Sequence, residues 1–432
     1  MKINFIVIFV LLAITSFAQT KMERKPLPFS EALPESVSMS TERLTRIDSM
    51  CLKAVSKGDI PGAVALVARD GKIVYYKAFG KADNPSDRAM KRDDIFRIAS
   101  QTKAITATAV MMLWEEGKFQ LDDPISKYIP EFKNPQVLKT FQFSDTSYTT
   151  VPAKSGITIR QLLCHTSGLG YGFISDAVDE NFKLLYQKYG VVDAWTTANI
   201  SIAENTRKMA RLPLHFSPGE QYKYSNGLDV LGYLVEIVTG TPLDLFLKTR
   251  LFEPLGMNDT WFYLPADKVG RLVSLQKPEN GKWVHYPITG YDPDFPVTGA
   301  RRFLSGGAGL CSTAKDYATF LQMYLNGGEF NGKRFLSRTT IQTIMADQNG
   351  KFIDETGNKY YGLVFSVVTQ KGQNYGGLGN AGTFGWGGHF NTEYFADPKE
   401  KTIGILMKQT QEETSDETDL RFQMLVGQAV DD

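Results

Sequence analysis

Residues 96–114 read FRIASQTKAITATAVMMLW. This stretch holds a Ser-x-x-Lys motif, Ser100 to Lys103, at the start of an apolar segment that ends at Gly117. The spacing of its apolar residues predicts a helix. On a helix, positions i and i+3 share a face, so the Lys103 ammonium can reach the Ser100 hydroxyl. A serine at a helix start also lies beside unpaired backbone N–H groups, which can bind an oxyanion.

The Ser-x-x-Lys motif has low specificity by itself, because the chain contains two more copies. One copy begins at Ser274, in a segment with little periodicity. The other begins at Ser312, which we expect to cap a helix over residues 316–325. An ordinary helix N-cap is also the alternative interpretation of Ser100. The long apolar helix that follows Ser100 favours it as the reactive serine.

Two further elements can serve the same chemistry. Tyr224-Ser225-Asn226 places a phenol and an amide two residues apart, so one loop can provide a base and a group that holds substrate. Tyr324 and Asn326 repeat this spacing, but Tyr324 continues an apolar stripe and is predicted to lie in the core. Near the C-terminus, residues 385–389 read GWGGH. Glycines on a strand edge let the backbone approach a ligand and leave N–H donors free.

The order of the predicted elements indicates one sheet built from both ends of the chain. A helix is predicted over residues 40–58, and Asp70-Gly71 predicts a hairpin between two β-runs. We expect a mixed α/β (α+β) fold, in which residues 40–99 and 300–432 form an antiparallel sheet flanked by helices. Residues 100–299 form an inserted, mostly helical domain, and the active site lies at the interface.

The N-terminal residues 1–18 have the features of a signal peptide. Lys2 is followed by an apolar run over residues 5–14 and by the small-x-small site Ser16-Phe17-Ala18. The run is too short to span a bilayer, and no later uncharged apolar run reaches 18 residues. We therefore expect an exported protein, periplasmic or extracellular after cleavage, without a membrane span. Residues 19–39 are predicted to form an extended arm.

Composition excludes several classes of function. The 432 residues include 48 Lys and Arg against 47 Asp and Glu, so the formal charge of +1 argues against nucleic acid as a partner. The four histidines are scattered, and the chain has no His-Glu-x-x-His or Cys-x-x-Cys, so we expect neither a metal nor a cofactor. Gly-x-Ser-x-Gly is absent, which argues against a nucleophile elbow. The three cysteines are predicted to be buried free thiols.

With its three elements in this order, the chain resembles the penicillin-recognising serine hydrolases. These include class C β-lactamases, family VIII carboxylesterases, and D-amino-acid or D-alanyl peptidases. The resemblance extends from about residue 40 to residue 410 and implies the β-lactamase/transpeptidase-like fold. Further short motifs carry it: Gly58 to Gly62 (GDIPG), His165 to Leu169 (HTSGL), Pro254 to Met257 (PLGM) and Gly306 to Leu310 (GGAGL).

The resemblance also implies roles for particular residues. Ser100 would be the acyl-forming nucleophile, and Lys103 and Tyr224 would share the role of base. Asn226 would hold the amide or carbonyl of the substrate. The backbone N–H groups of Ser100 and His389 would form the oxyanion hole, with Trp386, Gly387 and Gly388 placing the second of these groups. Tyr171 is expected to line the cleft.

One departure from the β-lactamase pattern bears on the substrate. Those enzymes usually carry Lys-Thr-Gly or Lys-Ser-Gly where this chain has Trp386-Gly387-Gly388. The missing cation and hydroxyl argue against efficient β-lactam turnover, whereas the Trp-Gly-Gly form is similar to that of family VIII esterases. We expect hydrolysis of short-chain acyl esters. The alternatives are a class C-like β-lactamase or a D-amino-acid/D-alanyl peptidase acting on β-lactams or short peptides, and a catalytically silent binding or scaffold protein on the same fold. The sequence decides neither the physiological substrate nor the oligomeric state.

Overall fold

The computed structural model describes residues 29–172, 179–350, 356–412 and 416–432. The predicted signal peptide, residues 1–18, lies outside the described residues. Of the predicted arm, residues 29–39 are described. They include the short strand β1 (Ser30–Glu31), which pairs parallel with β3, and a 3₁₀ turn, η1 (Pro34–Val37).

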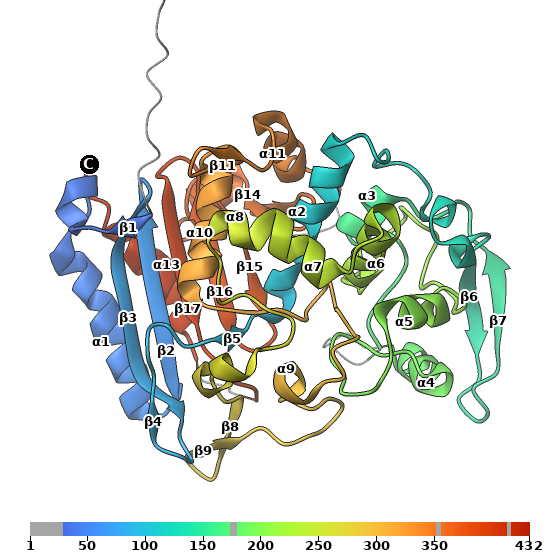
Figure 1. Cartoon of the computed structure of the whole chain (residues 1–432), viewed down its shortest axis with the longest axis horizontal. Helices are drawn as coiled ribbons and strands as arrows, with labels where there is room; N and C mark the ends of the chain where they lie inside the picture. The colour runs from blue at the N-terminus through green and yellow to red at the C-terminus, as the bar shows by residue number, and fades with distance from the viewer. Residues whose placement is uncertain (1–28, 173–178, 351–355, 413–415) are drawn as a thin grey trace, which may run out of the picture.

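Strands from both ends of the chain form one sheet, as predicted (Figure 1). β2 (Gly62–Arg69) and β3 (Lys72–Asp83) form the hairpin at Asp70-Gly71, where both residues have positive φ, 48° and 74°, as a type I′ turn requires. β2 also pairs antiparallel with β17 (Thr402–Met407). In the described residues this sheet has nine strands, in the order β1-β3-β2-β17-β16-β15-β14-β13 with β4 beside β3. The other strands are β4 (Arg88–Ala89), β13 (Lys359–Tyr361), β14 (Ser366–Val368), β15 (Phe384–Gly388) and β16 (Thr392–Asp397).

Helices cover both faces of the sheet. As a result, β2 is buried along its whole length. Alternate side chains of a strand point to opposite faces. Those of Val64, Leu66 and Ala68 lie in the main core, with residues of α2 and of α10 (Ala314–Leu325). Those of Ala63, Ala65 and Val67 pack in a second core with residues of α1 (Thr41–Lys57) and α13 (Thr418–Gln428).

Two helix starts test the sequence patterns. α1 begins after Ser40, whose hydroxyl accepts a hydrogen bond from the Arg43 N–H at 3.2 Å, and ends at Gly58, as expected. The prediction that Ser312 caps α10 was wrong. Strand β10 (Cys311–Ser312) continues through Ser312, so the cap falls on Thr313, which accepts from the Asp316 N–H at 3.1 Å.

The middle of the chain is mostly helical, as predicted, and its part from β6 to α6 lies on the side of the molecule away from α1 (Figure 1). Two hairpins that the sequence patterns missed interrupt it, β6–β7 and β8–β9. Its strands are β5 (Phe96–Arg97, at its start), β6 (Gln136–Phe141), β7 (Tyr148–Pro152), β8 (Gln276–Glu279) and β9 (Lys282–His285). Its α-helices are α2 (Thr102–Glu115), α3 (Ile159–Leu163), α4 (Glu180–Tyr189), α5 (Ile202–Met209), α6 (Gly227–Thr239), α7 (Leu243–Leu247), α8 (Glu253–Leu255) and α9 (Phe295–Thr298). Its other helical turns are η2 (Ala99–Gln101), η3 (Ile125–Lys127), η4 (Pro130–Phe132), the π-helical η5 (Lys248–Phe252) and η6 (Ala266–Arg271).

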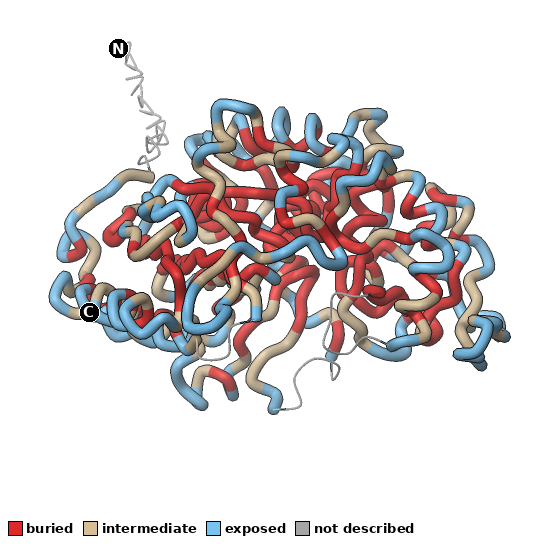
Figure 2. The backbone as a smooth tube through the Cα atoms, turned by 90° about the horizontal axis from the view of Figure 1, so that it is seen from below, coloured by how far each residue is buried: buried red, intermediate tan, exposed pale blue. Residues whose placement is uncertain are grey.

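Short elements between β10 and β17 complete the described fold: β11 (Glu329–Phe330), β12 (Lys333–Arg334), α11 (Arg338–Met345) and α12 (Gln370–Tyr375). α2 lies at the centre of the molecule, and every residue from Thr102 to Leu113 is buried. Figure 2 shows that the buried chain concentrates in the interior of the molecule. Cys51, Cys164 and Cys311 are buried free thiols, as predicted. Among the described helices, none is by itself long and apolar enough to cross a membrane.

A buried cluster of charged side chains links the end of β17 to the start of α13. Lys408, which follows β17, is 0% exposed. Its ammonium donates to Asp416, to the Thr418 hydroxyl at 2.9 Å and to Asp419 at 2.8 Å. Burial by itself would raise the pKa of Asp416, but the Lys408 charge and several hydrogen bonds hold it below its ordinary value. The cluster therefore stabilises the fold only while the cation is present.

Replacing Lys408 by Met should lower the free energy of unfolding by about 3–5 kcal/mol, because two carboxylates would lose their cation. Urea-induced unfolding measures the change. Lys401→Met is the matched control, since the Lys401–Asp70 pair is largely exposed and a pair of this kind contributes about 1 kcal/mol or less. Equal losses in the two variants would contradict the assignment of Lys408 as a structural ion.

Candidate active site

Ser100 lies in η2, the turn between β5 and α2. The preceding residue, Ala99, has φ of 43°, in the left-handed region that costs a non-glycine residue about 1–2 kcal/mol. Ala99 is held there in a buried cluster that includes Trp195 and Phe390. Packing therefore fixes a strained turn and presents Ser100 at the start of the buried helix α2.

Lys103 is the buried partner of Ser100, one helical turn along the chain. Its side chain is 1% exposed, and its ammonium donates three hydrogen bonds. The acceptors are the Ser100 hydroxyl at 3.3 Å, the Tyr171 hydroxyl at 3.0 Å and the Gly307 carbonyl at 2.8 Å. The first of these is the contact that the Ser-x-x-Lys spacing predicts.

The other two Ser-x-x-Lys copies have no such geometry. Lys277 forms ion pairs with Glu279 and Glu412 at the surface. Lys315 is exposed, and the Ser312 hydroxyl bonds to that of Thr260 at 2.8 Å. The structure thus separates the three copies as the sequence context does.

Tyr224 reaches the same site from the loop before α6. The Lys103 ammonium lies 4.6 Å from the centre of its ring, and the His165 ring lies at the same distance on another side. The Trp386 indole N–H donates to the Tyr224 hydroxyl at 3.2 Å, and the two rings stack at 5.6 Å. This hydrogen bond and the stacked ring fix the orientation of the Tyr224 phenol.

The glycine-rich element lies on β15, as predicted, and its end packs against the turn that carries Ser100. A Cβ at Gly388 would lie 2.6 Å from the Ile98 carbonyl oxygen, so only glycine allows this approach. At Gly387 a Cβ would lie 2.4 Å from a carboxylate oxygen of Glu393, on the neighbouring strand β16. The backbone at Gly388 and His389 therefore runs beside Ser100. The binding of an oxyanion by the His389 N–H stays a prediction.

A cavity of about 460 Å³ opens at this point. Its lining includes Ser100, Tyr224, Gly387, Gly388 and His389, together with Trp386. Trp386 is thus a cavity residue as well as a packing partner of Tyr361, at 5.3 Å between ring centres.

Two predicted site residues lie deeper than expected. Tyr171 is 4% exposed and touches Lys103 but does not line the cavity. Asn226 is 0% exposed, and its amide donates to the Tyr186 hydroxyl at 3.4 Å. The predicted contact of Asn226 with substrate therefore stays a prediction.

Burial leaves most titratable neighbours of Lys103 neutral. It raises the pKa of Tyr171 well above the ordinary value of a phenol, and it raises that of Tyr186 as well. Burial, assisted by the charge of Lys103, lowers the pKa of His165 well below that of a free imidazole. Near neutral pH these three groups carry no charge.

The sequence patterns missed two groups at the site. The Gly307 carbonyl accepts a hydrogen bond from Lys103, and the Asp229 carboxylate accepts one from the Gly307 N–H at 2.9 Å. The Gly306 to Leu310 motif is visible in the sequence, but nothing there shows that its carbonyl faces Lys103. Asp229 lies one helical turn beyond Tyr224's loop, and only the fold brings it to the site.

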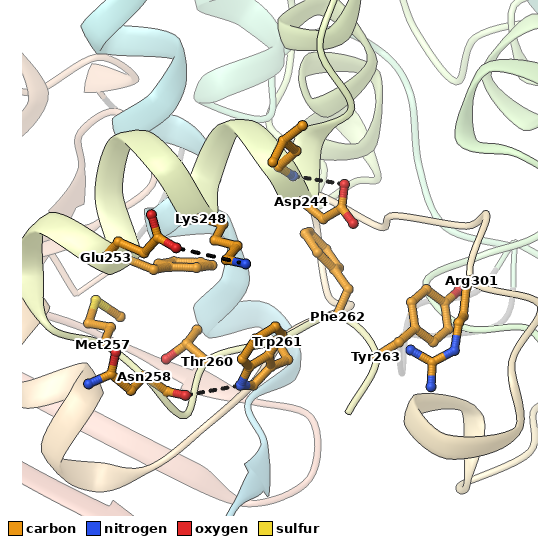
Figure 3. Close-up of a pocket in the computed structure, with 12 residues that line it drawn as sticks. Asp244, Lys248, Glu253, Met257, Asn258, Thr260, Trp261, Phe262, Tyr263 and Arg301 are labelled. Atoms are coloured by element: carbon orange, nitrogen blue, oxygen red, sulfur yellow. Dashed lines mark hydrogen bonds and ion pairs between the residues drawn. The ribbon is translucent and has the colours of Figure 1, made fainter. Parts of the chain in front are cut away.

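A second cavity, of about 500 Å³, lies between the helix from α7 to α8 and residues 257–263 (Figure 3). It has aromatic side chains, such as Trp261, but its charged groups interact with the chain itself. Lys248 pairs with Glu253 at 3.8 Å, and Arg301 donates to the Leu264 carbonyl. Its lining includes no serine, cysteine or histidine. The Ser100 cavity is therefore the better candidate for catalysis.

The described residues contain no group of three or more His, Cys, Asp or Glu side chains that could hold a metal ion. The chemistry that the site can perform is set instead by a hydroxyl, an amine, a phenol and backbone N–H groups.

Comparison with known proteins places this geometry in a family. Residues 44–428 match the family described as Beta-lactamase. The chain is 33% identical to esterase EstB of Burkholderia gladioli over 377 residues, 84% of this chain and 90% of EstB. It is 29% identical to the lovastatin esterase of Penicillium rubens over 383 residues, 83% of this chain and 91% of that protein.

A solved structure agrees with the fold. EstCE1, described as a hydrolase with promiscuous acyltransferase activity, superimposes with a TM-score of 0.74 at 25% identity. The match covers 90% of this chain and 98% of EstCE1. It confirms the β-lactamase/transpeptidase-like fold. The chain belongs to the Beta-lactamase family and is a serine hydrolase.

Proposed function

We propose that the protein hydrolyses short-chain acyl esters through a covalent intermediate on Ser100, with Lys103 and Tyr224 as the shared base. The observation that carries this proposal is the distance of 3.3 Å between the buried Lys103 side-chain nitrogen and the Ser100 hydroxyl oxygen, which lets the nitrogen, in its neutral form, accept the serine proton. A serine hydroxyl is a weak nucleophile until a neighbour accepts its proton. A base in this position contributes about 10²–10⁴-fold to the rate.

The reaction has two parts. The Ser100 oxygen attacks the ester carbonyl carbon, its proton passes to the Lys103–Tyr224 pair, and the carbonyl oxygen becomes an oxyanion held by the N–H groups of Ser100 and His389. The alcohol then leaves with the proton from the pair, and the acyl group remains on Ser100. Water attacks the acyl-enzyme with the same help and releases the carboxylic acid. The proton is assigned to the pair, because the Lys103 side-chain nitrogen lies 4.6 Å from the centre of the Tyr224 ring and both groups face Ser100.

The choice of esters rests on Trp386 and on the relatives. An indole stands where β-lactamases usually have a lysine, so this position offers an apolar surface in place of a cation; the lysine that does line the cavity, Lys359, comes from another strand, β13. EstB, the lovastatin esterase and EstCE1 are described as esterases or a hydrolase, which supports the same class of substrate for this chain.

Ser100→Ala should reduce hydrolysis of p-nitrophenyl acetate and butyrate by about 10³-fold or more, because the nucleophile is lost. Initial rates of purified protein measure this loss. Ser274→Ala is the matched control, since Ser274 begins another Ser-x-x-Lys and lies outside the site; its rate should equal that of the wild type. Equal rates for Ser100→Ala and wild type, or failure of a fluorophosphonate to label Ser100, would favour a silent binding protein.

A panel of substrates decides between the esterase and its enzymatic alternatives. We expect kcat/KM for p-nitrophenyl butyrate to exceed that for a chromogenic cephalosporin and for a D-Ala-D-Ala peptide by at least about tenfold, equivalent to about 1.4 kcal/mol. The physical reason is the indole of Trp386 in place of a lysine. Faster turnover of the cephalosporin would assign a β-lactamase, and faster turnover of the peptide a D-alanyl peptidase.

We also propose export, with cleavage after Ala18. In a bacterial host, mature protein should collect outside the cytoplasm with Gln19 as its first residue, which N-terminal sequencing of the fractions would detect. Ile8→Arg places a charge in the apolar run and should retain the uncleaved chain inside. Wild-type protein found in the cytoplasm with residues 1–18 intact would refute export.

A further inference from the structure

The carbonyl of Gly307 belongs to a tightly folded loop, Ser305 to Gly309. The Gly309 N–H donates to the Ser305 carbonyl at 2.9 Å, and the Ala308 N–H donates to the Ser305 hydroxyl at 3.1 Å. These bonds turn the loop so that the Gly307 carbonyl accepts from Lys103 at 2.8 Å. The position of the Lys103 amine thus depends on the shape of this loop.

Asp229 holds the loop from the first turn of α6. One oxygen of its carboxylate accepts from the Ser305 hydroxyl at 2.7 Å and from the Gly307 N–H at 2.9 Å. The side chain is 1% exposed, and its other oxygen has no hydrogen-bond partner among the described residues. A carboxylate is thus buried with half of its acceptor capacity unused.

Holding the loop does not by itself require a charge. Ser305 and Gly307 offer two neutral donors, which the amide oxygen of an asparagine would accept equally well. Burying a carboxylate costs several kcal/mol more than burying an amide. The use of aspartate at this position therefore points to its charge, and the charge to compensate is the buried ammonium of Lys103.

Gly307 brings the two charges together. A Cβ at Gly307 would lie 3.3 Å from the Tyr171 hydroxyl, which accepts from Lys103, and 3.4 Å from the Asp229 carboxylate. Burial raises the pKa of Asp229, while the donors of Ser305 and Gly307 and the charge of Lys103 oppose that rise. The carboxylate and the ammonium therefore act on each other through a dry region.

The other titratable groups that face this pair are Tyr171, Tyr186, Tyr224, His165 and Asp193. Burial keeps the first two phenols and the imidazole neutral, and Tyr224 belongs to the base itself. Asp193 acts on Tyr171 and Tyr186, and its carboxylate accepts from the Gly172 N–H at 2.7 Å. Asp229, in contrast, accepts hydrogen bonds from the Ser305 to Gly309 loop, whose Gly307 carbonyl accepts from Lys103.

We propose that Asp229 is a positioning residue that fixes the Gly307 carbonyl on Lys103 and supplies the negative charge that balances its ammonium. This inference rests on the proposed function, because it assigns Lys103 to the base. Asp229 acts through Lys103 and Gly307 and does not touch substrate.

The proposal predicts a shift in the pH profile. Asp229→Asn keeps the acceptor for Ser305 and Gly307 but removes the charge, so Lys103 should lose its proton at lower pH. The acidic limb of kcat/KM for p-nitrophenyl butyrate should move about one pH unit toward acid, since a nearby opposite charge shifts a pKa by about 1–3. Thermal unfolding of each variant establishes that it is folded. Should Asp229→Asn fail to fold, the smaller Asp229→Ser carries the same prediction.

Two controls separate charge from structure. Ser305→Ala removes the hydrogen bond to the same carboxylate and the one from the Ala308 N–H but keeps the carboxylate, so its acidic limb should move less than that of Asp229→Asn. Asp316→Asn removes a buried carboxylate on α10, which accepts from Thr260 and the Asp259 N–H, and should also leave the limb in place. An acidic limb of Asp229→Asn that coincides with the wild type, or an equal shift in Ser305→Ala, would overturn the proposal.

Failure of the proposed function gives a different result. If wild type and Ser100→Ala hydrolyse esters equally slowly, the rate of fluorophosphonate labelling of Ser100 against pH replaces the ester assay, and the same shift is expected. If the wild-type Ser100 is not labelled at any pH, Lys103 activates nothing and both proposals are wrong.

Discussion

The burial of one ammonium group, that of Lys103, is the constraint on which the site depends. A charged amine removed from water must be hydrogen-bonded and electrically balanced. Here a hydroxyl, a phenol and a backbone carbonyl accept its three hydrogens, and each comes from a different part of the chain. The requirement therefore links the start of α2 with Tyr171 and the Gly307 loop. It also explains why α2, which carries Lys103, lies at the centre of the molecule.

The order of the sheet decides what surrounds this amine. β2 pairs with β17, so the C-terminal strands continue the sheet that the N-terminal strands begin, and β15 reaches the turn of Ser100. Glycines at the end of β15 permit the close approach to the Ile98 carbonyl. The same strand carries Trp386, whose indole N–H binds Tyr224. One strand thus both places the backbone beside Ser100 and orients the Tyr224 phenol.

The chemical character of the cavity depends on β15, which has the indole of Trp386 where β-lactamases usually have a lysine. An indole at residue 386 packs on Tyr224 and Tyr361 and adds an apolar wall without adding charge. Lys103 and Asp229 are buried behind that wall, whereas Lys359 and Glu393 line the cavity itself. The burial of Lys103 fits the proposed ester hydrolysis, in which its side chain would take part in proton transfer away from bulk water.

Local sequence patterns determined individual helices, turns and caps of this protein. The Ser100–Lys103 spacing, the Asp70-Gly71 turn and the Ser40 cap depend on neighbouring residues, and each is found where the sequence predicts it. The resemblance of the ordered motifs to those of a known family predicted the fold as well. It also identified Tyr224, Tyr171 and Trp386 as candidate site residues. Local pattern was wrong by one residue at the cap of α10 and missed the two hairpins of the helical part.

Only the tertiary structure decided how the charges are arranged. Asp229 and the Gly307 carbonyl are 126 and 204 positions beyond Lys103, and no local signal marks either as its neighbour. The depth of Asn226, the strained φ of Ala99 and the bond from Trp386 to Tyr224 likewise depend on packing between distant segments. The reason is physical: helix and turn propensities act over a few residues, whereas the balance of a buried charge is set by whatever the completed fold places around it.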